Sequence, residues 1–269
     1  MKLDLRNPVN FSGRSIPALT LSLMLGLGLA TSAIADDIFA KGRVQAMSEY
    51  LAAQEALSFS YDATLDVVTP EDQKLAVASS GTVALKRPDK LQATRSAGFA
   101  DVEMSFDGKT LTILGKNQNK YTQVEIPGSI AHLVDVMRDK HGRPLPAADL
   151  LLSNSYDLLM EGVEDIKDLG SGVIGGVECD SLAFRSKDVD WQIWIAHGDK
   201  PYPCRYVITS KRVPNGPSYS IQLKDWKTGK EVAASDFEFK NTSKASKVDL
   251  KDLQGAGDLP DQFVTGESK

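Results

Sequence analysis

The chain beyond residue 36 opens with apolar side chains at helical spacing. Ile38, Val44, Met47 and Leu51 lie close to one helical stripe, and no proline occurs before about Leu57. This pattern predicts an amphipathic helix over about 38–57.

A period of two then replaces the helical period. Ala63, Leu65 and Val67 alternate with polar residues, and Val83 and Leu85 do the same. Such alternation is typical of antiparallel strands with one buried face. Two further alternating runs, over 102–106 and 111–113, flank Asp107-Gly108, a pair that suits a tight hairpin because glycine tolerates positive φ.

The middle of the chain returns to helical spacing after a further strand over 121–126. Pro127-Gly128 breaks that strand, Ser129 can cap a helix, and apolar residues recur from Ile130 to Met137. A short second helix over "AADLLLSNS" follows Pro146. The intervening "HGRPLP" contains helix-breaking residues, so we predict a two-piece lid over 130–152 with a hinge between its parts.

The last third of the chain reads as strands again, over 179–185, 191–196, 205–209 and 219–225. The stretch "GSGVIGG" at 170–176 lacks the Lys-Ser/Thr of a phosphate-binding loop and is interpreted as a turn. Trp191 and Trp194 fall on opposite faces of one strand, and core roles are expected for both. Strands on both sides of a helical insertion predict an α+β fold built on one large, curved antiparallel sheet.

The N-terminus has the order of a secretory signal peptide. Cationic residues precede the apolar run "IPALTLSLMLGLGLA", and Ala33-x-Ala35 is a typical cleavage site. The run is shorter than the ~20 residues of a spanning helix. We therefore expect a signal peptide over 1–35, a single domain over 36–254, a flexible tail over 255–269, and a periplasmic protein.

Charge narrows the choice of partners. Cleavage after residue 35 would remove three cations and one anion, so the formal charge would move from −5 to −7. This balance argues against nucleic acid as a partner. We expect a monomer, with envelope proteins as further candidate partners.

Candidate catalytic chemistry is sparse in the sequence. His132, His141 and His197 lie far apart and share no metal-ligand spacing with the cysteines. There is no Gly-x-Ser-x-Gly nucleophile motif. We predict no enzyme, no catalytic residues, no metal and no cofactor.

Several stretches resemble one known superfamily. "GTVALKRPDKL" followed by "FDGKTLTIL" resembles the region of outer-membrane lipoprotein carriers, the LolA-like superfamily, where a strand ends in Lys-Arg-Pro and a later hairpin turns on Asp-Gly. "LPAADLL", "LAFRSKDVDWQIWI" and "YPCRYVIT" look more specifically like the predicted periplasmic proteins of domain-of-unknown-function family 2092, which are assigned to that superfamily. The similarity covers most of the chain after residue 36.

The resemblance implies an unclosed, strongly curved half-barrel whose apolar concave face is covered by helices and holds acyl chains. Such a cavity binds lipid by removing hydrocarbon from water, and the alternative is that the same residues fill an ordinary core. The candidate ligand-binding residues are Leu65, Val83, Leu85, Met104, Leu133, Met137 and Trp191.

Arg87 matches the arginine of the Lys-Arg-Pro stretch, which in lipoprotein carriers is associated with hydrogen bonds that hold the lid closed. Its five N–H donors suit several backbone carbonyls at once. The alternative is an exposed arginine before a turn at Pro88.

Cys179 and Cys204 are the only two cysteines. An even count in an exported chain predicts a disulfide. A simple meander instead places the two cysteines two strands apart, which is too far for the bond. We favour the disulfide because the prolines near residue 201 allow the chain to fold back.

Three functional classes remain. The leading one is a periplasmic binder or carrier of a lipid, lipoprotein or other hydrophobic ligand. The second is an envelope sensor or protein-interaction module with the same fold and no transported ligand. The third is a hydrolase whose site has no recognised motif.

Overall fold

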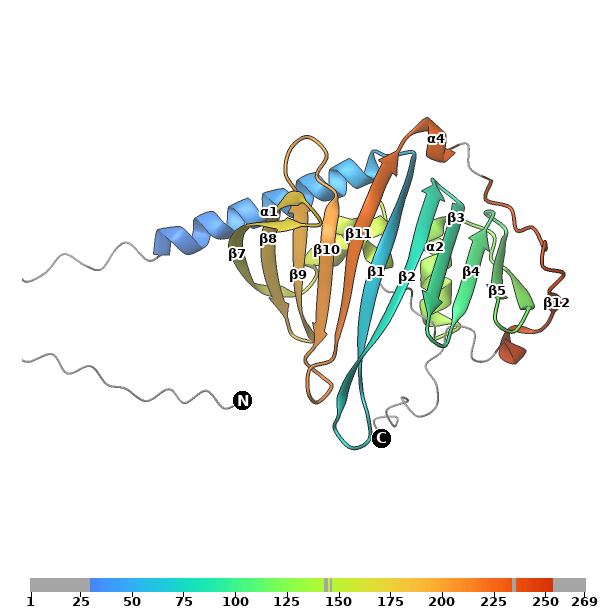
Figure 1. Cartoon of the computed structure of the whole chain (residues 1–269). Coiled ribbons are helices and arrows are strands. Elements are labelled where there is room, and N and C mark those ends of the chain that lie inside the picture. The colour runs from blue at the N-terminus through green and yellow to red at the C-terminus, as the bar shows by residue number, and fades with distance from the viewer. Residues whose placement is uncertain (1–29, 143–144, 146, 234–235, 254–269) are drawn as a thin grey trace, which may run out of the picture.

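The computed structural model describes residues 30–142, 145, 147–233 and 236–253. In this part of the chain one twelve-stranded sheet runs across the molecule, and α1 and α2 lie behind it (Figure 1). The strand order is β12-β6-β5-β4-β3-β2-β1-β11-β10-β9-β8-β7. Because β12 and β7 stand at opposite ends and do not pair, the sheet is unclosed, and the predicted α+β class is confirmed.

The strands are β1 (Ala56–Val68), β2 (Lys74–Lys86), β3 (Lys90–Ala97), β4 (Asp101–Phe106), β5 (Thr110–Gly115), β6 (Lys120–Glu125), β7 (Val163–Ile174), β8 (Val177–Ser186), β9 (Val189–Ala196), β10 (Pro203–Ser210), β11 (Ser218–Thr228) and β12 (Ser246–Lys247). The α-helices are α1 (Ala30–Ala52), α2 (Ile130–Asp139), α3 (Ser155–Met160) and α4 (Lys230–Ala233). Two 3-10 helices complete the set, η1 (Ala148–Leu151) and η2 (Leu250–Asp252).

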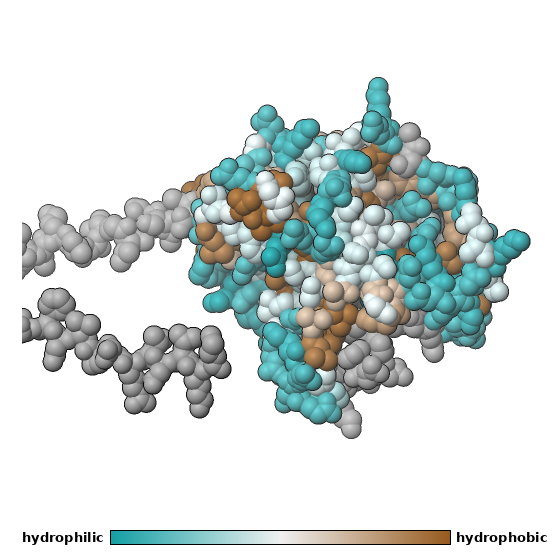
Figure 2. Space-filling model, in the orientation of Figure 1, coloured by the Kyte–Doolittle hydropathy of each residue, from teal (hydrophilic) through white to brown (hydrophobic). Residues whose placement is uncertain are grey.

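Pairing is antiparallel throughout except between β12 and β6, which run parallel. The two longest strands, β1 and β2, form a hairpin in the middle of the sheet. The other edge of β1 pairs with β11, so Leu57 lies opposite Thr228. The outer face of the sheet is mainly hydrophilic, as alternation requires when the other face is buried (Figure 2).

Helix α1 supplies the longest covering element. Ala40, Val44, Met47 and Leu51 are completely buried and follow the predicted stripe. Two details of the prediction are wrong. The helix ends at Ala52 rather than near Leu57, because residues from 56 onward pair in β1, and Ile38 is 68% exposed rather than part of the buried stripe.

Helix α2 begins where the sequence predicts. The Ser129 side chain accepts a hydrogen bond from the His132 backbone N–H at 3.2 Å, as an N-cap should. The second predicted helix is replaced by the short η1 followed by a separate helix, α3. The structure places Ala147 in the left-handed region with φ of 59°, a conformation that a helix interior does not allow.

The predicted strands and the Asp107-Gly108 hairpin are confirmed, but two long strands were missed. Strand β3 was not predicted because Arg95 occupies one of the alternate positions, between Ala93 and Ala97, that are otherwise apolar. Strand β7 contains most of the glycine stretch that the sequence assigned to a turn, and only Gly175 and Gly176 lie in the turn itself. As an edge strand, β7 can hold glycines and charged residues that a central strand disfavours.

The predicted signal peptide lies mostly outside the described residues, as does the predicted tail over 255–269. The described part of α1 begins at Ala30 and passes through the predicted cleavage site. Within the described ranges, no helix combines the length and the apolar character needed to cross a membrane.

Gly81 lies at a close approach between neighbouring strands. The Tyr61 hydroxyl of β1 donates a hydrogen bond of 2.9 Å to the Thr94 carbonyl of β3, although Gly81 of β2 stands between these strands. A Cβ at Gly81 would lie 1.9 Å from that carbonyl oxygen and 2.8 Å from the Tyr61 hydroxyl. Only glycine leaves room for this contact.

We therefore expect Gly81→Ala to lower the free energy of unfolding by about 1–3 kcal/mol, the usual cost of overpacking. Chemical denaturation of wild type and variant measures the change. Gly98→Ala is the matched control because its Cβ would meet nothing within 4 Å. Equal losses in the two variants would contradict the steric argument.

Candidate functional site

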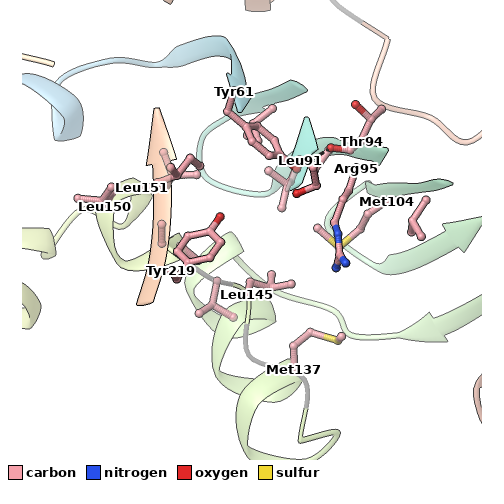
Figure 3. A pocket seen from close by; sticks show the side chains of 18 of the residues that line it. Tyr61, Leu91, Thr94, Arg95, Met104, Met137, Leu145, Leu150, Leu151 and Tyr219 are labelled. Carbon is pink, nitrogen blue, oxygen red and sulfur yellow. Dashed lines mark hydrogen bonds between the residues drawn. The ribbon is translucent and has the colours of Figure 1, made fainter. Parts of the chain in front are cut away.

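A cavity of about 500 Å³ lies between the concave face of the sheet and the helical segment that covers it (Figure 3). Its walls come from strands β1 to β5 and β11 on one side, and from α2, Leu145 and the η1 region on the other. On α2 the lining residues are Ile130, Val134 and Met137, which recur on one helical face. The cavity therefore lies at the predicted place, under the predicted lid.

Four of the seven predicted ligand contacts lie on the cavity wall. They are Leu65, Val83, Met104 and Met137. Leu65 is 37% exposed, so the cavity opens toward solvent near this part of β1. Their role in binding stays a prediction.

The other three, Leu85, Leu133 and Trp191, are buried in the core and are not part of this wall. Leu133 is on the same side of α2 as Met137, one turn away, but is completely buried. Trp191 stacks on Phe184 with ring centroids 3.9 Å apart and meets the edge of Tyr206. The Trp191 indole therefore packs against protein rings. Because none of the three lines the cavity, a ligand contact for them stays a prediction that this cavity does not support.

Strand β11 supplies cavity residues that the sequence did not assign to the site. Tyr219, Ile221 and Leu223 line the cavity, and their alternation is visible in the sequence. What the sequence did not reveal is that β11 pairs with β1 and so lies beside Phe59 and Tyr61.

Part of the cavity wall is polar. It contains Tyr61, Thr94, Arg95 and Tyr219, all labelled in Figure 3. Burial raises the pKa of both tyrosines, while the positive charge of Arg95 acts in the opposite direction on each. Both hydroxyls therefore stay protonated at neutral pH.

Arg87 joins three segments through backbone carbonyls. Its Nε donates to Gln54 O at 3.2 Å, and its Nη2 donates to Leu51 O at 3.2 Å and to Leu151 O at 2.8 Å. Leu51 lies in the last turn of α1 and Gln54 lies two residues beyond the helix, at the end where a cation is favourable. Leu151 belongs to η1, which also lines the cavity.

The turn at Pro88 anchors α2, the first helix of the predicted lid. The Ile130 backbone N–H donates to Pro88 O at 2.9 Å, so α2 begins against the residue that follows Arg87. Burial lowers the pKa of Arg87 from its usual value, but an arginine remains charged at neutral pH. These contacts fit the predicted latch, and the movement of a lid stays a proposal.

A further hydrogen bond connects η1 to the sheet. The Tyr206 hydroxyl donates to Asp149 Oδ2 at 3.3 Å. Burial raises the pKa of Asp149, whose carboxylate has lost much of its contact with water. Two separate contacts, from Arg87 and from Tyr206, thus hold η1.

The two cysteines are free thiols in the structure, so the predicted disulfide is not formed there. The prediction that a meander would place the two cysteines too far apart for a bond is wrong. Cys179 lies opposite Ala196 as expected, but the register shifts between Pro203 and Arg205, and this irregularity brings the two sulfurs to 2.8 Å. Burial raises the pKa of both thiols, which keeps them protonated.

One histidine belongs to a charged cluster at the edge of α1. His197 Nε2 lies 2.6 Å from Asp180 Oδ1, and Arg43 Nε lies 2.6 Å from Asp180 Oδ2. Arg43 also donates to Ala196 O at 2.9 Å, so the cluster fastens α1 to β8 and β9. Among the described residues, no group of three or more His, Cys, Asp or Glu side chains could hold a metal ion.

Comparisons with known proteins add a family and a set of similar folds. A family model described as "Predicted periplasmic protein (DUF2092)" matches residues 40–251. A search of curated proteins finds no match.

Among solved structures, the lipoprotein LppX of Mycobacterium tuberculosis is similar at 12% identity with a TM-score of 0.48, over 75% of this chain and 100% of LppX. LprF of Mycobacterium bovis has 13% identity and a TM-score of 0.44, over 76% of this chain and 98% of LprF. A LolA superfamily protein of Nitrosomonas europaea has 10% identity and a TM-score of 0.32, over 71% and 94% of the two chains.

We expect Arg87→Lys to loosen the lid, because one ammonium cannot reach the three carbonyls that the guanidinium contacts. The free energy of unfolding should fall by about 1–3 kcal/mol, and amide exchange should accelerate over residues 148–152. Hydrogen exchange followed by mass spectrometry measures the rate of amide exchange in both segments that Arg87 contacts, η1 and the end of α1.

Arg185→Lys on β8 is the control, because the Arg185 side chain is exposed and pairs with Asp190. Unchanged exchange over 148–152 in Arg87→Lys would contradict the latch.

A lid segment as protected as β1 and β11 in the wild type, with and without added lipid, would argue against any gate.

Proposed function

The chain belongs to the DUF2092 family of predicted periplasmic proteins, and from this premise we propose that it is a periplasmic binding or carrier protein for a lipid, lipoprotein or other hydrophobic ligand. The ligand would lie against the concave face of the sheet, beneath α2 and η1. The protein would bind this ligand as a monomer, without catalysing a reaction and without a cofactor.

The apolar cavity is the observation that carries this proposal. A core built only for stability is packed to the density of an organic crystal, with few voids larger than a water molecule. A cavity of about 500 Å³ falls instead within the ~300–1,000 Å³ of small-molecule sites. An acyl chain placed in it would gain ~0.8 kcal/mol for each CH₂ removed from water.

The lining residues also suit an adaptable ligand. Met104 and Met137 face the cavity from opposite walls, one on β4 and one on α2. Methionine side chains are flexible and polarisable, so they can adjust to chains of different shape. The Arg87 contacts to η1 would set how easily such a ligand enters.

We expect protein purified from the periplasm to release a lipid into an organic extract, detected by mass spectrometry. Ala93→Trp should abolish this signal, because Ala93 lines the cavity and an indole would fill the space. Ala78→Trp is the control, since Ala78 is exposed on β2 and does not line the cavity.

Two outcomes would contradict the proposal that the protein carries a lipid in this cavity. Equal lipid recovery from both tryptophan variants would place the lipid elsewhere on the protein. Absence of lipid, together with one stable protein partner captured from envelope extracts, would support the alternative of a sensor or protein-interaction module. Circular dichroism establishes that both variants are folded.

Export to the periplasm makes a second expectation testable. The neighbouring sulfurs of Cys179 and Cys204 should be oxidised to a disulfide by the periplasmic machinery, whereas protein made in the cytoplasm without residues 1–35 should keep both thiols. Alkylation under denaturing, non-reducing conditions followed by intact-mass measurement distinguishes the two. Two alkyl groups on the exported protein would show that the bond does not form.

A further inference from the structure

The cavity has a charged side chain in its wall. Arg95 lies on β3, where residues 91, 93 and 95 face the cavity, and it is partly buried. Among the described residues that line the cavity, Arg95 alone carries a charge, and no carboxylate is present. The cavity wall therefore includes a guanidinium, a group that a purely hydrocarbon ligand does not need.

Two hydroxyl groups lie close to this charge. The side chains of Arg95 and Tyr219 project into the same space from β3 and β11 (Figure 3). The charge of Arg95 acts on both Tyr219 and Tyr61, which places their hydroxyls within electrostatic reach of the guanidinium. Since the Tyr61 hydroxyl already donates to Thr94 O, Tyr219 is the tyrosine positioned to donate to a ligand.

We propose that this polar part of the wall, Arg95 and Tyr219, binds the acidic head group of a single-chain amphiphile, a carboxylate or a phosphate monoester. The inference rests on the proposed function, since the alkyl chain of the same ligand occupies the apolar cavity. Arg95 already takes part in an interaction within the protein, and its guanidinium offers five N–H donors in all. Guanidinium groups match carboxylate and phosphate oxygens in a planar, two-point geometry.

The surroundings strengthen such a contact. A charge pair in a site of low dielectric interacts more strongly than in water, so an ionised ligand oxygen near Arg95 would gain more free energy here than at the protein surface. The apolar wall formed by Met104, Met137 and Leu145 would hold the chain. A neutral ester of the same chain would keep the apolar contacts and lose the charged ones, while a cationic head group would be repelled.

The test compares ligands that share one chain and differ in the head group. Dodecanoate, dodecyl phosphate and methyl dodecanoate are titrated below their micelle concentrations, with displacement of the neutral probe phenylnaphthylamine as the signal. Wild-type protein should bind at least one of the two anions about tenfold or more tightly than the ester, the size of a hydrogen bond to a charged group. The tighter anion identifies the head group as carboxylate or phosphate.

Arg95→Gln should abolish this preference and leave the affinity for the ester within about twofold of wild type, because glutamine keeps most of the side-chain volume and removes the charge. Arg185→Gln, an exposed arginine on β8, is the control for loss of one positive charge. If Arg95→Gln does not fold, as judged by circular dichroism, Tyr219→Phe replaces it and should weaken anion binding about threefold.

The outcomes separate this inference from the function on which it rests. Equal binding of anion and ester by the wild type, or a preference that survives in Arg95→Gln, overturns the head-group site and leaves the apolar carrier standing. Unchanged anion binding in Tyr219→Phe counts against the site in the same way. Displacement of the probe by none of the three ligands overturns the proposed function, and the head-group site with it.

Discussion

The guanidinium of Arg87 occupies the point where the sheet and its covering helices meet. It donates to the Leu51 carbonyl in the last turn of α1 and to the Leu151 carbonyl of η1, 64 residues after Arg87 in the sequence. One rigid, permanently charged group satisfies both, while the following residue receives the first N–H of α2. Apolar contacts between the helices and the sheet are not directional, so this junction helps to fix where α1, η1 and α2 sit on the sheet.

The concave face is divided into a filled half and a hollow half. On the side of β8 and β9, Phe184, Trp191 and Ile193 are buried beneath α1, and aromatic stacking fills the space. On the side of β1 to β5, the cover consists of the shorter α2 and η1, and the cavity remains. The same open sheet of twelve strands thus has a packed core on one side and a cavity on the other.

The sequence predicted those elements whose signal is local. The stripe of α1, the Ser129 cap and the Asp107-Gly108 hairpin each depend on residues a few positions apart. The errors have a different origin. Tyr219 lines the cavity because β11 pairs with β1, a pairing that the sequence did not predict. Trp191 does not line it, because its ring packs against Phe184 and Tyr206. The sulfurs of Cys179 and Cys204 meet because of an irregularity in β10, which no periodicity encodes.

The pairing of β1 with β11 also has consequences for how the chain reaches this structure. The two strands come from opposite ends of the domain, so the sheet cannot become continuous until the chain up to Thr228 is available. Contacts between residues so distant in sequence make folding slow, because a long loop must lose conformational entropy before the strand pairing contributes stabilising free energy. Until then the edge of β1 that pairs with β11 has no partner, and unpaired strand edges of this kind associate readily with other chains. The strand order that leaves a cavity beside the sheet therefore also makes the central strand pairing depend on one of the last strands in the chain.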